Sequence, residues 1–337
     1  MQPQALEHIR RLTQHLASNE DRLTIDADTH ATDLARYPRR PVAHYYHGRA
    51  LPAEDLVAEM DMAAVSMANT WQNPACTEYP GGEDENAESL LEANRYIAWC
   101  GRQYPDRFIP SGWTDPKACG VANACRIAEA CVREFGFVLV KMNPAQNQFP
   151  IDSPDVLRVV DRIVELGAIP VFHYGADSPF TPASGLEQVA LRHPEHPVVG
   201  VHMGGGGAAF MDAEELYHRS RELGLRRPNI RFIFSAKRDT HIEEALIAYQ
   251  LAGPPFCHNL FCGSDAPYGR MSWNFGGFRL MFETLMDARR HPDPRIRGNP
   301  GLFDECAARN YLGGNFARMI LRGYEHLLKV QQAAVAV

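Results

Sequence analysis

The chain has 337 residues, a formal net charge of −7 and 45% hydrophobic residues, so it can bury a sizeable core and is not globally disordered. It has no basic stretch of the kind that binds nucleic acid and no apolar run near the roughly 18 residues of a membrane span. Because residues 1–5 lack the charged start of a signal peptide and the eight cysteines are scattered, a cytoplasmic protein is expected.

The first predicted element is an amphipathic helix over residues 4–17, which repeats leucine and isoleucine at helical spacing. Eight strand-like segments follow, and helical patterns such as Asn86–Trp99, Ala122–Phe135 and Val156–Leu166 lie between most of them. The eight strand candidates are Leu23–Asp28, Ala63–Ala68, Phe108–Gly112, Phe137–Met142, Pro170–His173, Val198–His202, Ile230–Ser235 and Leu260–Asp265. Near-continuous apolar strands alternating with helices indicate a parallel sheet buried on both faces, and eight such units predict closure into a (β/α)8 barrel.

Two connections are too long for simple loops, residues 31–53 and residues 266–303. Each follows a strand that ends in a candidate site residue, so each is expected to lie over the active-site rim as a lid or binding loop. No repeat, low-complexity tract or linker divides the chain, which predicts a single domain over residues 1–337.

Four of the strand-like segments end in side chains that bind metal ions. Asp28 and His30 form an Asp-x-His pair, and His173, His202 and Asp265 follow in later segments. These side chains can meet only if their strands end on the same rim, which a (β/α)8 barrel provides. Residues two apart on a strand point to the same side, so Asp28 and His30 predict a buried metal site, with a structural Asp–His pair as the alternative.

The order and spacing of these motifs resemble the amidohydrolase superfamily, closest to the branch with aminocarboxymuconate-semialdehyde decarboxylase and γ-resorcylate decarboxylase. The resemblance runs from about residue 23 to about residue 320. It is carried by the segments 28–30, 140–144, 172–175, 202–205, 263–267 and 312–318. One departure is Asp28, since most of the superfamily has a histidine there; two carboxylates with two or three imidazoles suit Mn, Fe or Zn.

The resemblance implies a role for each of these residues. Asp28, His30, His173 and Asp265 would bind one divalent ion, with two ions as the alternative. His202 would be a general base acting on a metal-bound water, or a ligand of a second ion. Asp265 would also shuttle a proton at the reacting centre.

Other residues are candidate substrate contacts. Lys141 could pair with a substrate carboxylate, bridge two metals as a carbamate, or pair with a buried carboxylate such as Asp26. Trp71, Tyr174, Arg238 and His44 are candidates by position only, and packing or a solvated surface is the alternative for each.

The expected function is therefore decarboxylation or hydrolysis of a small anionic, carboxylate-bearing substrate. Decarboxylation is favoured because the whole-chain pattern resembles that branch and because Lys141 and Arg238 suit an anion. One alternative is a dinuclear Fe or Mn oxygenase on the same scaffold. Another is a supporting subunit of a hetero-oligomeric enzyme; otherwise a homodimer is expected.

Overall fold

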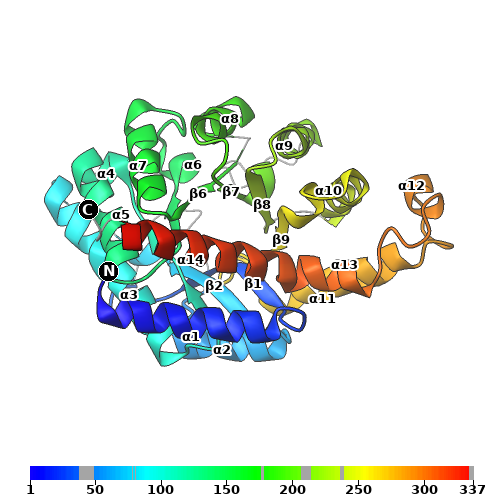
Figure 1. Ribbon diagram of the computed structural model, residues 1–337, viewed down its shortest axis with the longest axis horizontal. Helices are drawn as coiled ribbons and strands as arrows, with labels where there is room; N and C mark the ends of the chain where they lie inside the picture. Colours follow the sequence, from blue (N-terminus) through cyan, green and yellow to red (C-terminus); the bar gives the residue numbers. More distant parts are fainter. Residues whose placement is uncertain are drawn as a thin grey trace.

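A computed structural model describes residues 1–37, 49–77, 79, 81–175, 178–205, 214–235 and 239–333 (Figure 1). Its strands are β1 (Ile25–Ala31), β2 (Met67–Gln72), β3 (Phe108–Pro110), β4 (Gly112–Trp113), β5 (Leu139–Met142), β6 (Ile169–His173), β7 (Val198–Val201), β8 (Ile230–Phe234) and β9 (Leu260–Cys262). Only Ser111 separates β3 from β4, so these two short strands form the third of eight barrel positions. Every strand pairs in parallel with its neighbour in chain order, from β1 to β3 and from β4 to β9.

The sheet closes between its first and last strands. Thr29 pairs in parallel with Ala266 beyond the end of β9. The His30 amide donates to the Ala266 carbonyl at 2.7 Å, and the Asp265 amide donates to the Asp28 carbonyl at 2.9 Å. The predicted (β/α)8 barrel is confirmed.

Helices surround the strands. The long ones are α1 (Pro3–Asn19), α2 (Ala53–Met62), α3 (Glu83–Gln103), α5 (Val121–Arg133), α7 (Pro154–Glu165), α8 (Ala183–Arg192), α9 (Glu214–Arg226), α10 (Asp239–Ala252), α11 (Met271–Met286) and α14 (Asn315–Ala333). The short ones are α4 (Pro116–Cys119), α6 (Pro144–Asn147), α12 (Pro294–Arg297) and α13 (Glu305–Arg309), with single turns η1 (Pro74–Cys76), η2 (His202–Gly204), η3 (Phe256–His258) and η4 (Asn310–Gly314). No helix within the described ranges is long and apolar enough to cross a membrane.

The leading amphipathic helix is present as α1, and the helix predicted over 156–166 is present as α7. Gly167 follows with φ +82°, the left-handed conformation expected of a glycine after a helix. The second strand begins later than the predicted range of Ala63–Ala68. Ala63 still caps α2, and Ala64 turns with φ +49°, so the strand begins only at Met67.

The long connection over residues 266–303 was expected to lie over the rim. The start of this connection does lie at the rim, where the Tyr268 ring is 5.7 Å from that of His30. Its longest element, α11, instead belongs to the outer ring of helices, because it contacts α2 and α10 and buries one apolar side. The buried side chains of α11 include Phe275, Phe278 and Phe282. Of the other long connection, residues 38–48 lie outside the described residues.

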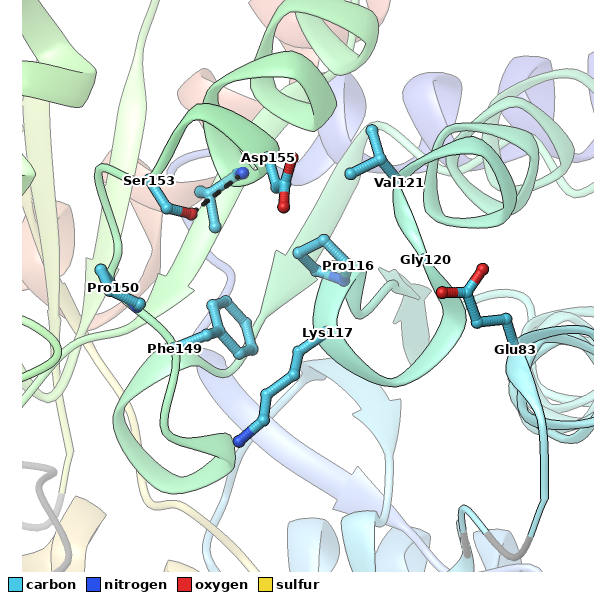
Figure 2. Close-up of a pocket in the computed structure, with 10 residues that line it drawn as sticks. Glu83, Pro116, Lys117, Gly120, Val121, Phe149, Pro150, Ser153 and Asp155 are labelled. Atoms are coloured by element: carbon cyan, nitrogen blue, oxygen red, sulfur yellow. Dashed lines mark hydrogen bonds between the residues drawn. The ribbon is translucent and has the colours of Figure 1, made fainter.

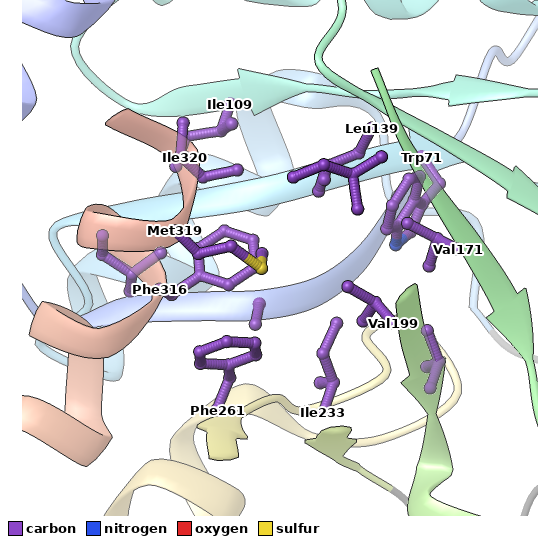
Figure 3. Packing of buried hydrophobic residues seen from close by; sticks show 14 of the residues in the cluster. Trp71, Ile109, Leu139, Val171, Val199, Ile233, Phe261, Phe316, Met319 and Ile320 are labelled. Atoms are coloured by element: carbon purple, nitrogen blue, oxygen red, sulfur yellow. The ribbon is translucent and has the colours of Figure 1, made fainter. Parts of the chain in front are cut away.

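The closing helix covers the amino-terminal end of the barrel. Phe316, Met319 and Ile320 of α14 meet side chains of the strands, among them Phe261, whose ring lies 5.4 Å from that of Phe316 (Figure 3). The turn η4 directly precedes this helix in the chain. It approaches the start of β1 so closely that a Cβ at Gly313 would lie 2.1 Å from the Leu23 carbonyl oxygen. α1 lies alongside α14 (Figure 1). These apolar side chains of α14 form the floor of the barrel. The polar end of the barrel is therefore its carboxyl-terminal rim.

Candidate metal centre

Three acidic and imidazole side chains converge at the carboxyl-terminal rim of the barrel. Asp28 of β1, His202 after β7 and Asp265 after β9 each offer a ligand atom, and these atoms lie within 4.8 Å of one another. Asp28 and His202 are almost fully buried. The three come from the first, sixth and eighth barrel positions, so only closure of the barrel brings them together.

The backbone turns sharply at two of these residues. His202 has φ +72° and Asp265 has φ +58°, in the left-handed region that side chains other than glycine seldom adopt. Each turn comes immediately or shortly after a strand, and each redirects the chain where the side chain joins the site. Such strain costs about 1–3 kcal/mol per residue and is found mainly at functional sites.

Asp28 is held by three hydrogen-bond donors. Its Oδ1 accepts from Trp71 Nε1 at 3.0 Å and from Lys141 Nζ at 3.3 Å, and its Oδ2 accepts from Ser235 Oγ at 2.8 Å. Burial by itself would raise the pKa of Asp28, but the charge of Lys141 and the other neighbours hold that pKa below its usual value. Asp28 is therefore ionised and can act as an anionic ligand.

The tautomer of His30 follows from its hydrogen bond. Its Nδ1 lies 2.8 Å from the Gln72 carbonyl oxygen, which can only accept, so Nδ1 carries the proton. Burial, then the charge of Lys141, lowers the pKa of His30 to about 3, so the ring is neutral and Nε2 presents a lone pair. This Nε2 lies 3.6 Å from Asp265 Oδ1 and 3.9 Å from Asp28 Oδ1.

Ser235 links Asp28 to His202. Its Oγ donates to Asp28 and lies 2.8 Å from His202 Nδ1. A hydroxyl has one proton, so His202 Nδ1–H is the donor of the second bond, and in the neutral form of the ring the lone pair would be on Nε2. Bonds of this kind fix the orientation of metal-binding imidazoles.

Lys141 is enclosed by aromatic rings. Its side chain is fully buried, and Nζ lies 5.0 Å from the Trp71 ring centre and 5.1 Å from that of Trp113. Cation–π attraction at these distances, together with the Asp28 carboxylate, compensates the buried charge. The predicted pairing of Lys141 with a buried carboxylate is present, and its partner is Asp28 rather than Asp26.

The two remaining carboxylates differ in their surroundings. Asp26 Oδ1 accepts from the amides of Asp28 and Ser264, at 3.1 and 2.9 Å, and so ties β1 to the segment after β9. Burial raises the pKa of Asp26 to about 7. Burial, then the charge of Asp28, raises the pKa of Asp265 well above its usual value.

The ligand atoms of Asp28, Asp265 and His30 fit a divalent cation. His30 Nε2 lies 3.6 Å from Asp265 Oδ1 and 3.9 Å from Asp28 Oδ1, so a nitrogen lone pair and two carboxylate oxygens converge on one point. A cation bound there would also stabilise the ionised form of Asp265. Oxygen and imidazole donors of this kind suit Mn, Fe or Zn.

The other predicted residues occupy different positions. The His173 ring lies edge-on to that of His202, 4.4 Å away, so its assignment as a ligand stays a prediction. Tyr174 is not brought to the centre: its ring stacks on Phe232, and its hydroxyl lies 3.1 Å from Ser220 Oγ on the helical side of the sheet. Arg238 and His44 lie outside the described residues.

Sequence reasoning missed the function of Ser235 and the second aromatic ring beside Lys141. Ser235 ends its predicted strand at a rim position, which is a weak signal, since serine is common there. No feature of the sequence predicts the contact of Trp113 with Lys141, because that contact depends on the pairing of β4 with β5.

A separate cavity of about 480 Å³ lies among the ends of α3, α4, α5 and α7 (Figure 2). Its polar lining includes Glu83, Lys117 and Asp155. Lys117 Nζ already donates to the carbonyl of Asn147 at 2.9 Å. None of the lining residues is a candidate ligand, so this cavity is distinct from the metal centre.

The amidohydrolase family profile (Amidohydro_2) matches residues 25–268, which include every candidate ligand. No curated protein matches the chain in sequence.

Solved structures with the same fold cover most of the chain. A 2,6-dihydroxybenzoate decarboxylase in complex with 2,6-dihydroxybenzoate superposes with a TM-score of 0.62 at 14% identity, covering 89% of this chain and 98% of the other. For 5-carboxyvanillate decarboxylase from Sphingomonas paucimobilis the TM-score is 0.57 at 19% identity, with 89% and 99% covered. A dihydroxybenzoic acid decarboxylase from Polaromonas sp. JS666, with manganese and the inhibitor 2-nitroresorcinol bound, gives 0.59 at 15% identity, with 89% and 97% covered. At these low sequence identities the structural similarity establishes the fold alone.

Proposed function

Because this chain belongs to the amidohydrolase family, we propose that it is a metal-dependent enzyme that decarboxylates a small aromatic carboxylate. The observation that carries the proposal is the convergence of the Asp28 and Asp265 carboxylates on the unprotonated Nε2 of His30. Hydrolysis of a small carboxylate-bearing substrate is the second candidate, because the same donor set serves both reactions.

Manganese and an aromatic carboxylate are the first cofactor and substrate class to test. Structures of the same fold include a dihydroxybenzoic acid decarboxylase with manganese and a 2,6-dihydroxybenzoate decarboxylase with its substrate. The donor set of this chain, with two carboxylates, is at the hard end of the range that binds Mn, Fe or Zn.

In this proposal Asp28, His30, Asp265 and His173 hold the ion. A bound divalent ion would supply a Lewis acid for an oxygen of the substrate. Asp265 exchanges the proton: its carboxylate lies 3.6 Å from His30 Nε2 at the centre, from where it can deliver a proton to the carbon that loses CO2. His202, oriented by Ser235, is the base in the hydrolytic alternative.

Lys141 favours one ion over two. Its ammonium lies 3.3 Å from Asp28 Oδ1, so a second divalent cation sharing that carboxylate would be repelled at close range. Carbamylation would reverse this charge and permit a dinuclear centre. A mononuclear centre therefore favours decarboxylation or hydrolysis over the oxygenase alternative.

The test is metal content and product analysis on protein purified without chelators. One equivalent of Mn or Zn per chain, with CO2 released from 2,6-dihydroxybenzoate or 5-carboxyvanillate, is the expected result. Hydrolysis of carboxylate esters or lactones without CO2 would move the proposal to the second candidate. Two equivalents of Fe with oxygen uptake would refute both.

His202→Asn separates ligation from base catalysis, since the asparagine amide can still donate to Ser235. We expect this variant to keep one ion and lose turnover. Loss of the ion would make His202 a ligand.

A further inference from the structure

The buried carboxylate of Glu59 on α2 holds two chain segments that follow ligand-bearing strands. Glu59 is only 2% exposed, and its Oε1 accepts from Arg49 Nη2 at 2.6 Å and from Arg270 Nη1 at 3.1 Å. Arg49 lies in the connection between β1 and α2, and Arg270 lies five residues after Asp265. One carboxylate oxygen is therefore bonded to both segments.

The segment after β9 is a tight turn beside the candidate metal centre. The amides of Tyr268 and Gly269 donate to the Asp265 carbonyl at 2.7 and 2.9 Å, in the turn where Asp265 has its left-handed backbone. The Tyr268 ring lies edge-on to the His30 ring, 5.7 Å away. Because Arg270 directly follows this turn, its ion pair restrains the chain that carries Asp265 and Tyr268.

Hydrogen bonds at the strand ends join the same two segments a second time. The Thr32 amide donates to the Leu51 carbonyl at 2.9 Å, and the Leu51 amide donates to Thr32 Oγ1 at 2.8 Å. Asn73, directly after β2, donates to Thr32 Oγ1 at 3.0 Å and accepts from the Tyr268 hydroxyl at 2.6 Å. These contacts close a ring that we call the rim circuit, formed by Thr32, Arg49, Leu51, Glu59, Asn73, Tyr268 and Arg270.

Glu59 is the charged joint of the rim circuit. Its side chain is buried, whereas those of Arg49 and Arg270 are nearly half exposed, so without Glu59 both arginines could turn into solvent. A hydrogen bond to an ionised group is about twice as strong as a neutral one, and Glu59 makes two of them. Arg270 also lies 5.9 Å from the Trp273 ring, but that contact stays at the start of α11 and does not reach Arg49.

We propose that Glu59 is a positioning residue for the metal centre. By holding Arg49 and Arg270 together it closes the rim circuit, and the closed circuit fixes the turn that presents Asp265 and the ring of Tyr268. The inference rests on the proposed function in treating this centre as the active site. It assigns to a side chain of the outer helices, which contacts none of the candidate ligands, the role of coupling the two segments that border the centre.

The test is hydrogen exchange, measured by mass spectrometry on full-length protein in peptides that cover residues 49–52 and 266–270. Glu59→Gln keeps the size of the side chain and removes the charge. We expect exchange to become about tenfold faster in both peptides, the effect of losing a hydrogen bond to a charged group. Arg270→Gln should accelerate exchange only in residues 266–270, because Arg49 keeps its bond to Glu59.

Asp61→Asn is the control on the same helix. Asp61 is paired with Arg107 at 2.7 Å, so this variant also removes one charge and one ion pair from α2, and both peptides should exchange as in wild type. Unchanged exchange in Glu59→Gln, or acceleration in only one peptide, would overturn the proposal. If Glu59→Gln does not fold, the double variant Arg49→Gln, Arg270→Gln replaces it, with the same expected result in both peptides.

Manganese affinity, measured by competition with a chelating dye, shows whether the rim circuit acts on the centre. Glu59→Gln and Arg270→Gln should each bind manganese about tenfold more weakly, at the lower end for residues that orient a ligand from outside, and Asp61→Asn should bind it as wild type does. Equal affinity in all four proteins would show that Glu59 does not position the centre. A wild type that binds no manganese would instead refute the proposed function, while the exchange experiment, which needs neither metal nor substrate, still decides whether Glu59 couples the two segments.

Discussion

Ser235→Ala is the most direct test of how the candidate centre is built. Ser235 is not a ligand in our proposal; its hydroxyl donates to Asp28 and accepts from His202, both at 2.8 Å. The substitution removes one oxygen from a fully buried position and leaves the backbone of the strand end unchanged. Any effect on metal binding must therefore pass through the two side chains that Ser235 contacts.

The expected loss in metal affinity is about 10–100-fold, the usual effect of removing a group that orients a metal ligand. That factor corresponds to about 1.4–2.7 kcal/mol, close to the roughly 1.5–3 kcal/mol of one hydrogen bond to a charged group. Asp28 keeps its contacts with Trp71 and Lys141, so it should remain ionised and in place. The loss should be smaller than that of removing Asp28 itself.

The assay is competition for manganese or zinc against a chelating dye, with unfolding measured on the same samples. Ser220→Ala is the matched control. Ser220 is also fully buried and bonded through its hydroxyl, but to Tyr174 on the helical side of the sheet. If Ser235→Ala binds metal as tightly as wild type, or if Ser220→Ala weakens binding equally, the assignment of Ser235 as a positioning residue is wrong.

Three further predictions concern stability. Lys141→Met leaves the buried carboxylate of Asp28 without its cation and should destabilise metal-free protein by about 3–5 kcal/mol, with less loss when metal is bound; chemical unfolding with and without metal measures both. Burial lowers the pKa of His196 from 6.5 to about 4, so between these values the unfolded chain binds more protons than the folded protein. The free energy of unfolding should therefore fall by up to about 3 kcal/mol as pH drops through this window, and His196→Gln should flatten that slope in denaturant titrations. Gly313→Ala forces a Cβ against backbone and should cost about 1–3 kcal/mol, whereas Gly276→Ala on α11 meets open space and should stabilise by a few tenths to about 1 kcal/mol; equal melting temperatures would contradict the packing argument.

The barrel was predictable from the sequence because its evidence is local and repeated. Each strand is a short apolar run, each helix has its own period, and a segment such as Val156–Leu166 ends at a recognisable glycine. The prediction failed where local patterns were ambiguous. The apolar run of residues 63–68 is compatible with a strand or with the end of a helix, and in the structure residues 63–66 form the cap and turn after α2.

The candidate site was predictable in its residue types but not in its contacts. Asp28, His202 and Asp265 were recognised by their positions at strand ends, and the structure brings them together. The left-handed turns at His202 and Asp265, and the bond from Ser235, depend on strands that are far apart in the chain. No spacing rule in one sequence reports such contacts.

The way the barrel closes has a consequence for synthesis of the protein. Asp28 is made early, but its neighbour across the seam, Asp265, follows more than two hundred residues later, and the apolar floor waits for Phe316 of α14. A ribosome adds roughly 5–20 residues per second, so β1 remains without its final neighbours for about ten seconds or longer. During that interval the carboxylates of β1 lack the neighbours that bury them in the folded protein. The centre is therefore assembled in one late step, when the two ends of the sheet meet.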